Sequence, residues 1–317
     1  MTESSMLAIV QHRAGDAETL EQQRVPRPKP SGGEILVRVC ATALNPVDWK
    51  SRERGFLPDG SAPPFTLGWD VSGVVEEVAD GVTLFAPGDE VFGMPSFPHA
   101  GSAHAEYLVA PARHFASKPT ALSHQQAAAL PLAVLTAWQA LVETAGIQTG
   151  QRVLIPAAAG GVGHLAVQIA KAHGAYVIGT ASTAKHPLLR ELGVDEAIDY
   201  RQVDATQTVR EVDIVLDTLG GNNGLASLDT LKPGGILVSL LPLEPETQEL
   251  AAQRGIRAIR LMVTPDRDGL REVAALVEAE KLKPVIDSVF PLSEIKRAYQ
   301  RGETNRASGK IVVVPGS

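Results

Sequence analysis

The stretch that decides the fold covers residues 152–182 and reads RVLIPAAAGGVGHLAVQIAKAHGAYVIGTAS. It opens with a short apolar run, 153–157, which is typical of a strand buried on both faces. Small residues follow, then apolar residues recur at helical spacing over 162–170, and a second apolar run occupies 175–180. Strand, small-residue turn, helix and strand make one βαβ unit.

The turn of this unit carries the pattern G-x-G-x-x-G with its first glycine replaced by Ala158, while Gly160 and Gly163 remain. Gly160 lets the backbone approach a phosphate, and Gly163 lets the helix lie close to the sheet. Tight structural turns use the same residues, but a strand before and a helix after favour a dinucleotide site, with the pyrophosphate at the helix N-terminus. The residues expected to hold it are Ala159, Gly160, Gly161, Val162 and Gly163.

The end of the second strand indicates which dinucleotide binds. An NAD site usually places Asp or Glu about 20 residues after the turn, to bind the ribose 2′-hydroxyl. Residues 179–185 read GTASTAK and contain no carboxylate. The hydroxyl of Ser182 and the ammonium of Lys185 therefore favour the 2′-phosphate of NADPH, with no acid present to repel it. The alternative is that Lys185 only begins the next helix.

Composition narrows the class of protein. A chain of 317 residues is long for one core, so we expect two domains. The net charge of −7 gives no basic surface for nucleic acid or for an anionic membrane. No apolar run approaches the ~20 residues of a membrane span, and the single cysteine, Cys40, excludes a disulfide within the chain. We expect a cytoplasmic α/β protein.

The pattern along the chain predicts a domain inserted within another. Residues 1–122 show short strands with many Pro and Gly residues, which favours a mostly antiparallel, barrel-like domain. Residues 123–265 alternate helices with six strands, which completes a doubly wound parallel sheet for the cofactor. Residues 266–317 are too short for a third domain, so we expect them to finish the first.

Several segments together resemble one family. They are N45-PVDWK, G68-WDVSGVV, G88-DEVFG, A105-EY, the pair Leu130-Pro131, Thr136-Ala137, the turn at 157–163 and G309-KIVV. The chain is similar over nearly its whole length to the medium-chain dehydrogenase/reductase superfamily, in its zinc-independent, zeta-crystallin-like quinone oxidoreductase branch. The resemblance implies a GroES-like catalytic domain, a Rossmann domain, NADPH, and reduction of quinones or α,β-unsaturated carbonyls.

The resemblance also bears on metal binding. Zinc-dependent relatives carry a ligand Cys where Asn45 stands and a ligand His where Trp69 stands. An amide and an indole cannot replace a thiolate and an imidazole on zinc, and a structural site of four cysteines needs more than one. His99 and His104 fit no standard ligand spacing. We expect no metal.

Three residues are candidates for the reacting centre, each with a plainer alternative. Asn45 is expected to contact the nicotinamide ribose or the substrate, or else to be a turn residue before a proline. Lys50 supplies charge near a developing oxyanion, or pairs with Asp48. Thr136 resembles the family residue near the nicotinamide carboxamide, or bonds its own helix backbone.

Further expected contacts lie at strand ends. Tyr200 resembles a residue beside the 2′-phosphate, or is an ordinary aromatic at a strand end, and Thr218 and Leu240 end later strands, where open sheets bind ligands. The resemblance adds Lys310 to the cofactor contacts. The substrate is expected to contact Asn45, Trp49, Lys50 and Trp69. The sequence identifies no catalytic acid.

Two other functions stay open at this point. One is an enoyl reductase acting on carrier-bound thioesters, and the other is a non-enzymatic NADPH-binding or redox-sensing protein. The resemblance also implies a homodimer formed by pairing the strand at 256–263 edge to edge.

Overall fold

The computed structural model describes residues 5–316, and its contacts divide the chain into two compact units. The first unit comprises Met1–Leu135, Thr264–Ala279 and Pro284–Ser317, and the second comprises Thr136–Val263 with Glu280–Lys283. The first boundary between the two units lies between Leu135 and Thr136, inside helix α3 (Pro131–Trp138). The sequence pattern predicts this boundary earlier, after residue 122.

A six-stranded parallel sheet forms the centre of the second unit. Its strands are β8 (Arg152–Ile155), β9 (Tyr176–Ala181), β10 (Glu196–Asp199), β11 (Val212–Asp217), β12 (Leu231–Ser239) and β13 (Arg257–Arg260). They lie in the order β10-β9-β8-β11-β12-β13, and every neighbouring pair is parallel. This is the strand order 3-2-1-4-5-6 of a Rossmann sheet, so the doubly wound fold is confirmed.

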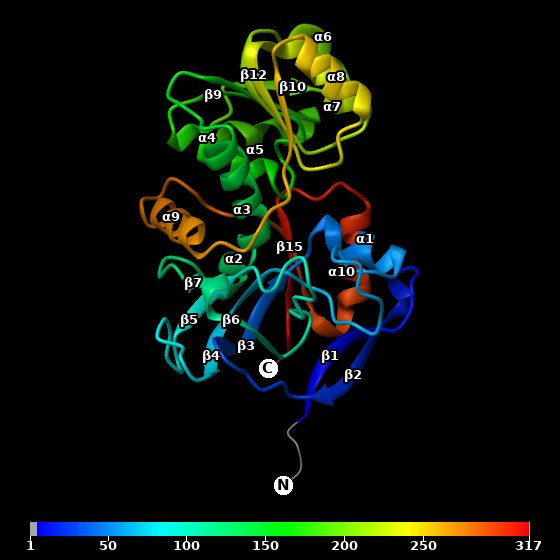
Figure 1. Ribbon diagram of the computed structural model, residues 1–317, viewed down its shortest axis with the longest axis vertical. Coiled ribbons are helices and arrows are strands. Elements are labelled where there is room, and N and C mark those ends of the chain that lie inside the picture. The colour runs from blue at the N-terminus through cyan, green and yellow to red at the C-terminus, as the bar shows by residue number, and fades with distance from the viewer. Residues whose placement is uncertain (1–4, 317) are drawn as a thin grey trace. The chain divides into compact units, whose positions relative to one another are not determined.

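Helices fill the connections of this sheet. They are the π-helix η3 (Gln139–Thr144), α4 (Gly163–Ala172), η4 (Thr183–Lys185), α5 (His186–Glu191), α6 (Ala205–Thr208), α7 (Asn222–Ser227), η5 (Leu228–Thr230) and α8 (Pro245–Gln253). Helix α4 buries Leu165, Ala166 and Ile169, as its periodicity predicts. Helices α7 and α8 pack together (Figure 1). Leu154, Ile178 and other strand residues form the core between sheet and helices.

The first unit is a mostly antiparallel β structure. Its strands are β1 (Ser5–Gln11), β2 (Leu20–Pro26), β3 (Glu34–Ala43), β4 (Val71–Val78), β5 (Glu90–Gly93), β6 (Tyr107–Pro111), β7 (Phe115–Ser117), β14 (Ile286–Pro291) and β15 (Lys310–Val314). A seven-stranded sheet has the order β14-β15-β3-β4-β5-β7, with β6 on β3, and β1 pairs with β2. Strand β15, red in Figure 1, pairs with the blue β3, so the chain does return to complete its first sheet.

The first unit also contains helices. They are η1 (Ala17–Thr19), α1 (Pro46–Arg54), η2 (Ala112–His114), α2 (His124–Ala128), α3, α9 (Arg267–Glu278), η6 (Leu292–Glu294) and α10 (Ile295–Glu303). Ser123 caps α2 through a reciprocal bond with Gln126, and Pro131 starts α3 as a separate helix. None of the helices within residues 5–316 has the length and apolar character that a bilayer crossing requires.

Candidate functional site

The turn between β8 and α4 has the shape that a pyrophosphate needs. The backbone N–H of Ala158 donates to the Thr180 carbonyl at 2.9 Å, and that of Ala157 donates to the Thr180 hydroxyl at 3.2 Å, which ties the turn to β9. A Cβ at Gly163 would lie 2.4 Å from the Ala157 carbonyl oxygen, so only glycine lets α4 begin this close. The first N–H groups of a helix lack a partner one turn earlier in the helix. Here those of His164 and Leu165 donate to the carbonyls of Gly160 and Val162, both at 3.1 Å, so the turn is wound tightly onto the start of α4. The turn therefore fits a dinucleotide phosphate.

Apart from Thr136 on α3, the expected cofactor residues of the second unit follow the carboxyl ends of five neighbouring strands. These are Ala159 to Gly163 after β8, Ser182 and Lys185 after β9, Tyr200 after β10, Thr218 after β11 and Leu240 after β12. Parallel strands end at one edge of a sheet, so the fold brings these residues to a common edge. The ring of Tyr200 is 57% exposed there, and Thr218 donates from its hydroxyl to the Pro156 carbonyl at 3.1 Å.

One part of the 2′-phosphate prediction was wrong: a carboxylate does lie beside this segment. Asp199, at the end of β10, accepts hydrogen bonds from the hydroxyl of Thr183 and, at 3.0 Å, from its backbone N–H. The Thr183 hydroxyl and the Arg201 backbone N–H lower the pKa of Asp199 to about 2, so it is ionised at neutral pH. The Arg201 guanidinium, 5.7 Å from the ring centre of Tyr200, adds a compensating cation. Asp199 is the last residue of β10 rather than of β9, so it is not at the position of the NAD-type acid.

Asp217 is a buried carboxylate that the sequence reasoning missed. It accepts from the backbone N–H groups of Leu219 at 3.0 Å and Gly220 at 2.9 Å, and from the hydroxyl of Ser239 at 3.0 Å. Gly220 adopts a φ of 72°, which suits glycine. Asp217 therefore fixes the loop that carries Thr218. The signal was available, because this acid ends an apolar strand and precedes a Gly-Gly pair.

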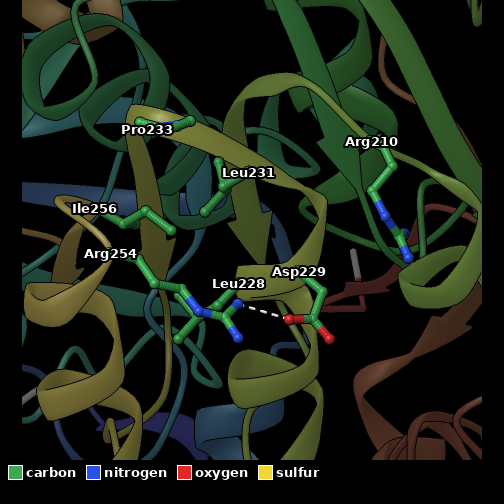
Figure 2. Close-up of a pocket in the computed structure, with 7 residues that line it drawn as sticks. All are labelled: Arg210, Leu228, Asp229, Leu231, Pro233, Arg254 and Ile256. Carbon is green, nitrogen blue, oxygen red and sulfur yellow. Dashed lines mark hydrogen bonds and ion pairs between the residues drawn. The ribbon is translucent and has the colours of Figure 1, made fainter.

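A cavity of about 460 Å³ lies elsewhere in the second unit, lined by Arg210, Leu228, Asp229, Leu231, Pro233, Arg254 and Ile256. Figure 2 shows Arg254 directed toward Asp229, with which it forms an ion pair of 2.6 Å, while Arg210 comes from a separate segment. Arg210 precedes β11 and Ile256 precedes β13, so the cavity lies at the amino ends of the strands. It is on the edge opposite the glycine turn, and it is distinct from the cofactor site.

In the first unit, Asn45 is the centre of a buried polar cluster. Its backbone N–H donates to Asp48 at 2.7 Å, and its side-chain N–H donates to Asp70 at 2.8 Å. Its amide oxygen accepts from the ammonium of Lys310, which also bonds Asp70 at 2.9 Å. Asn45 also precedes the proline that starts α1, so it serves in the turn and in the polar cluster.

Lys310 and Asp70 form a buried ion pair, although 240 residues separate them in the sequence. The Lys310 side chain is 3% exposed, and Asp70 is fully buried. Asp70 also accepts from the backbone N–H of Leu132 at 2.6 Å, near the start of α3. Three donors therefore compensate the buried carboxylate. Asp70 directly follows Trp69, but nothing in the sequence connects it with the last strand.

Asp48 does not pair with Lys50, so that alternative was wrong. It accepts instead from the backbone N–H groups of Asn45 and, at 3.1 Å, of Gly68. Burial raises the pKa of Asp48 to about 7, against the opposing effect of the hydrogen bond from Asn45. Among the described residues no ion pair joins Lys50 to this carboxyl group.

The two tryptophans of the expected substrate contacts are packed within the first unit. Trp69 is fully buried, and its indole N–H donates to the carbonyl of His99 at 2.7 Å. The ring of Trp49 lies against α10, where a Cβ at Gly302 would come within 2.8 Å of it. Thr136, on α3, is buried as well. Their contacts with substrate or cofactor stay predictions.

Metal ligands do not gather in the described part of the chain. Within residues 5–316, no group of three or more His, Cys, Asp or Glu side chains is arranged to hold a metal ion. Asn45 and Trp69 occupy the positions compared above with zinc ligands, and the amide of Asn45 is bonded to Asp70 and Lys310.

Comparison with known proteins agrees with this geometry. The family described as "Alcohol dehydrogenase GroES-like domain" matches residues 31–120, and "Zinc-binding dehydrogenase" matches 192–313. A chloroplast envelope quinone oxidoreductase homolog of Arabidopsis thaliana is 35% identical over 95% of both chains. An NADPH-dependent alkenal/one oxidoreductase of the same plant is 35% identical, over 98% of this chain and 80% of its own.

A comparison with solved structures identifies relatives of the same class. The quinone oxidoreductase from Coxiella burnetii superposes with a TM-score of 0.92 at 36% identity, covering 99% of this chain and all of its own. Both units, the parallel sheet with its glycine turn and the mostly antiparallel sheet, have their counterparts in these relatives. The chain is an oxidoreductase, and it belongs to the medium-chain dehydrogenase/reductase superfamily, in its zinc-independent quinone oxidoreductase branch.

Proposed function

We propose that this protein reduces quinones and α,β-unsaturated carbonyl compounds with NADPH. The carboxyl edge of the parallel sheet carries the proposal, because it joins the phosphate turn at 159–163 to Ser182, Lys185 and Tyr200. The relatives named for quinones and for alkenals or alkenones support the class of acceptor.

The chain's own groups have separate roles in this proposal. The bound nicotinamide supplies a hydride. The backbone at 159–163 cradles the pyrophosphate, although the Gly160 N–H itself donates to the Ala157 carbonyl at 2.8 Å, and the Lys185 ammonium neutralises the 2′-phosphate. Asn45 holds one side-chain N–H on Asp70, and the second N–H of the amide donates to the substrate carbonyl. This hydrogen bond stabilises the negative charge that collects on oxygen when hydride adds.

The test follows NADPH absorbance with purified protein and two acceptors, 1,4-naphthoquinone and trans-2-hexenal. We expect both to be reduced, and NADH to be a poorer donor than NADPH. Turnover with a crotonyl thioester but with neither acceptor would assign the chain to the enoyl reductases instead. NADPH binding without turnover of any of the three would identify a non-enzymatic NADPH-binding protein.

Two further properties belong to this proposal. We expect a homodimer in which β13 pairs with its symmetry mate, because β13 is an edge strand and offers one unpaired side. Residence in the cytoplasm, expected from the sequence, stays a prediction, which fractionation of the source cell tests.

A further inference from the structure

Strand β10 brings a carboxylate to the segment that is expected to bind the 2′-phosphate. It runs parallel to β9, with Asp199 in register with Ala181, so the two strands end at the same level of the sheet. Residues 182–185, which carry the expected phosphate contacts, directly follow Ala181. The end of the second strand of a dinucleotide-binding unit is where the adenosine ribose lies. The sheet itself therefore places Asp199 next to the ribose position, within one unit of the chain.

Hydrogen bonds hold the Asp199 carboxylate against this segment. Its Oδ2 accepts from the hydroxyl of Thr183 and, at 3.0 Å, from the Thr183 backbone N–H. Its Oδ1 accepts from the backbone N–H of Arg201 at 2.9 Å. Thr183 lies between Ser182 and Lys185 in the sequence. The carboxylate is thus fixed on the short segment that carries both expected phosphate contacts.

The donors that hold Asp199 keep it ionised. The Thr183 hydroxyl and the Arg201 backbone N–H contribute most to its low pKa, and the charge of the Arg201 guanidinium contributes less. Neutral donors stabilise the ionised form of a carboxyl group without cancelling its charge. A fixed negative charge therefore acts on whatever lies beside residues 182–185.

The two nicotinamide nucleotides differ at this position of the ribose. NADPH carries a phosphate there, with a charge of about −1.5 to −2 at pH 7, whereas NADH carries a neutral hydroxyl. A fixed carboxylate repels the phosphate and has little effect on the hydroxyl. The ammonium of Lys185 has the opposite effect on the phosphate. The segment thus combines one charge that favours NADPH with one that disfavours it.

We propose that Asp199 is a specificity-determining residue that narrows the preference of this chain for NADPH over NADH, an inference that rests on the proposed function. Lys185 attracts the 2′-phosphate and Asp199 repels it, so the preference reflects the difference between two opposing charges. Asp199 acts from the third strand, so it limits the affinity for NADPH without occupying the place of the NAD-type acid on the second.

The experiment measures dissociation constants of NADPH and NADH by calorimetry, for wild type and for Asp199→Asn, without any acceptor. Asn removes the charge and keeps an oxygen that can accept from Thr183. We expect D199N to bind NADPH about 3- to 10-fold more tightly, and NADH within about twofold of wild type. The matched control is Glu196→Gln, which removes an exposed carboxylate at the other end of the same strand and should change neither constant.

Salt distinguishes repulsion from a change in the shape of the loop. Ions shorten the range over which exposed charges interact, from about 10 Å at 0.1 M to about 3 Å at 1 M. The advantage of D199N over wild type for NADPH should therefore shrink as NaCl is raised across this range. A rearranged loop would keep its effect at high salt, and it would alter NADH binding as well.

The outcomes separate this inference from the function on which it rests. Wild type that does not bind NADPH would refute the proposed function. Wild type that binds NADPH, with D199N binding it no more tightly, would refute the role of Asp199 alone. So would a gain in D199N that NADH shares, that E196Q reproduces, or that salt leaves unchanged.

Discussion

Lys185 is the residue that we expect to distinguish NADPH from NADH, which differ by one phosphate. Replacing it with Glu puts a carboxylate where the 2′-phosphate is expected, and a lost charged hydrogen bond costs about 1.5–3 kcal/mol. We expect K185E to raise the KM for NADPH roughly 10- to 100-fold. The KM for NADH should change little, and steady-state kinetics with both donors measure this. Lys281→Glu makes the same charge change on an exposed lysine outside the segment, and it should affect neither. Equal losses for both cofactors in K185E would refute the phosphate site.

The ammonium of Lys310 has a structural role whatever it contributes to the cofactor. Replacing it with Met leaves the buried carboxylate of Asp70 without its cation, and breaking a buried pair in this way costs about 3–5 kcal/mol. Urea unfolding measures the loss. Lys118→Met is the control, because its partner Glu90 is exposed and is solvated when the lysine is lost. Similar losses in K310M and K118M would show that burial of Asp70 does not matter.

Asp48 makes stability depend on pH in the direction opposite to that of a carboxyl group whose pKa is lowered on folding. Its pKa rises from 3.8 to about 7 on folding, so between these values the folded state binds more protons than the unfolded state. Its contribution to stability is therefore present below pH 4 and is lost as pH rises through 7. Asp48→Asn removes the titration. The unfolding free energy of D48N minus that of wild type should increase from pH 4 to 7 and then level off. A constant difference across this range would contradict the raised pKa.

The start of α4 requires a glycine at position 163, because the backbone of the preceding turn lies too close for a side chain. Gly163→Ala sets a Cβ 2.4 Å from the Ala157 carbonyl and 2.8 Å from the Ala158 Cα, and both are backbone atoms that must move. We expect a loss of about 1–3 kcal/mol, typical of overpacking, together with weaker NADPH binding. At Gly160 the nearest atom would be 3.1 Å away, so G160A should cost less stability. Urea midpoints of both variants test the ranking, and G160A proving the more costly would overturn it.

At the scale of elements, local patterns were enough to predict the strands and most helices. Apolar runs mark β8 and β9, the helical spacing marks α4, and Pro131 divides α2 from α3. No local pattern indicates which side chains, distant in the sequence, form contacts with one another. Asp199 reaches Thr183 only because β10 lies beside β9, and Lys310 reaches Asp70 only because β15 lies in the sheet of β3 and β4. These polar contacts depend on topology, so they could not be predicted from the sequence, and the roles of the expected site residues stay predictions.

At the scale of the whole molecule, the edge strand β13 raises the question of assembly. Within residues 5–316, β12 is the one strand that pairs with it, so its other side presents unpaired backbone groups, and Met262 just beyond it is 50% exposed. We expect a dimer by light scattering at micromolar concentration. Met262→Asp should convert it to a monomer, because a charge on each copy would be brought together at the two-fold axis. Val203→Asp is the control, since this exposed residue follows β10, at the opposite edge of the same sheet, and should leave the dimer intact. A monomeric wild type, or dissociation by V203D but not by M262D, would exclude assembly through β13.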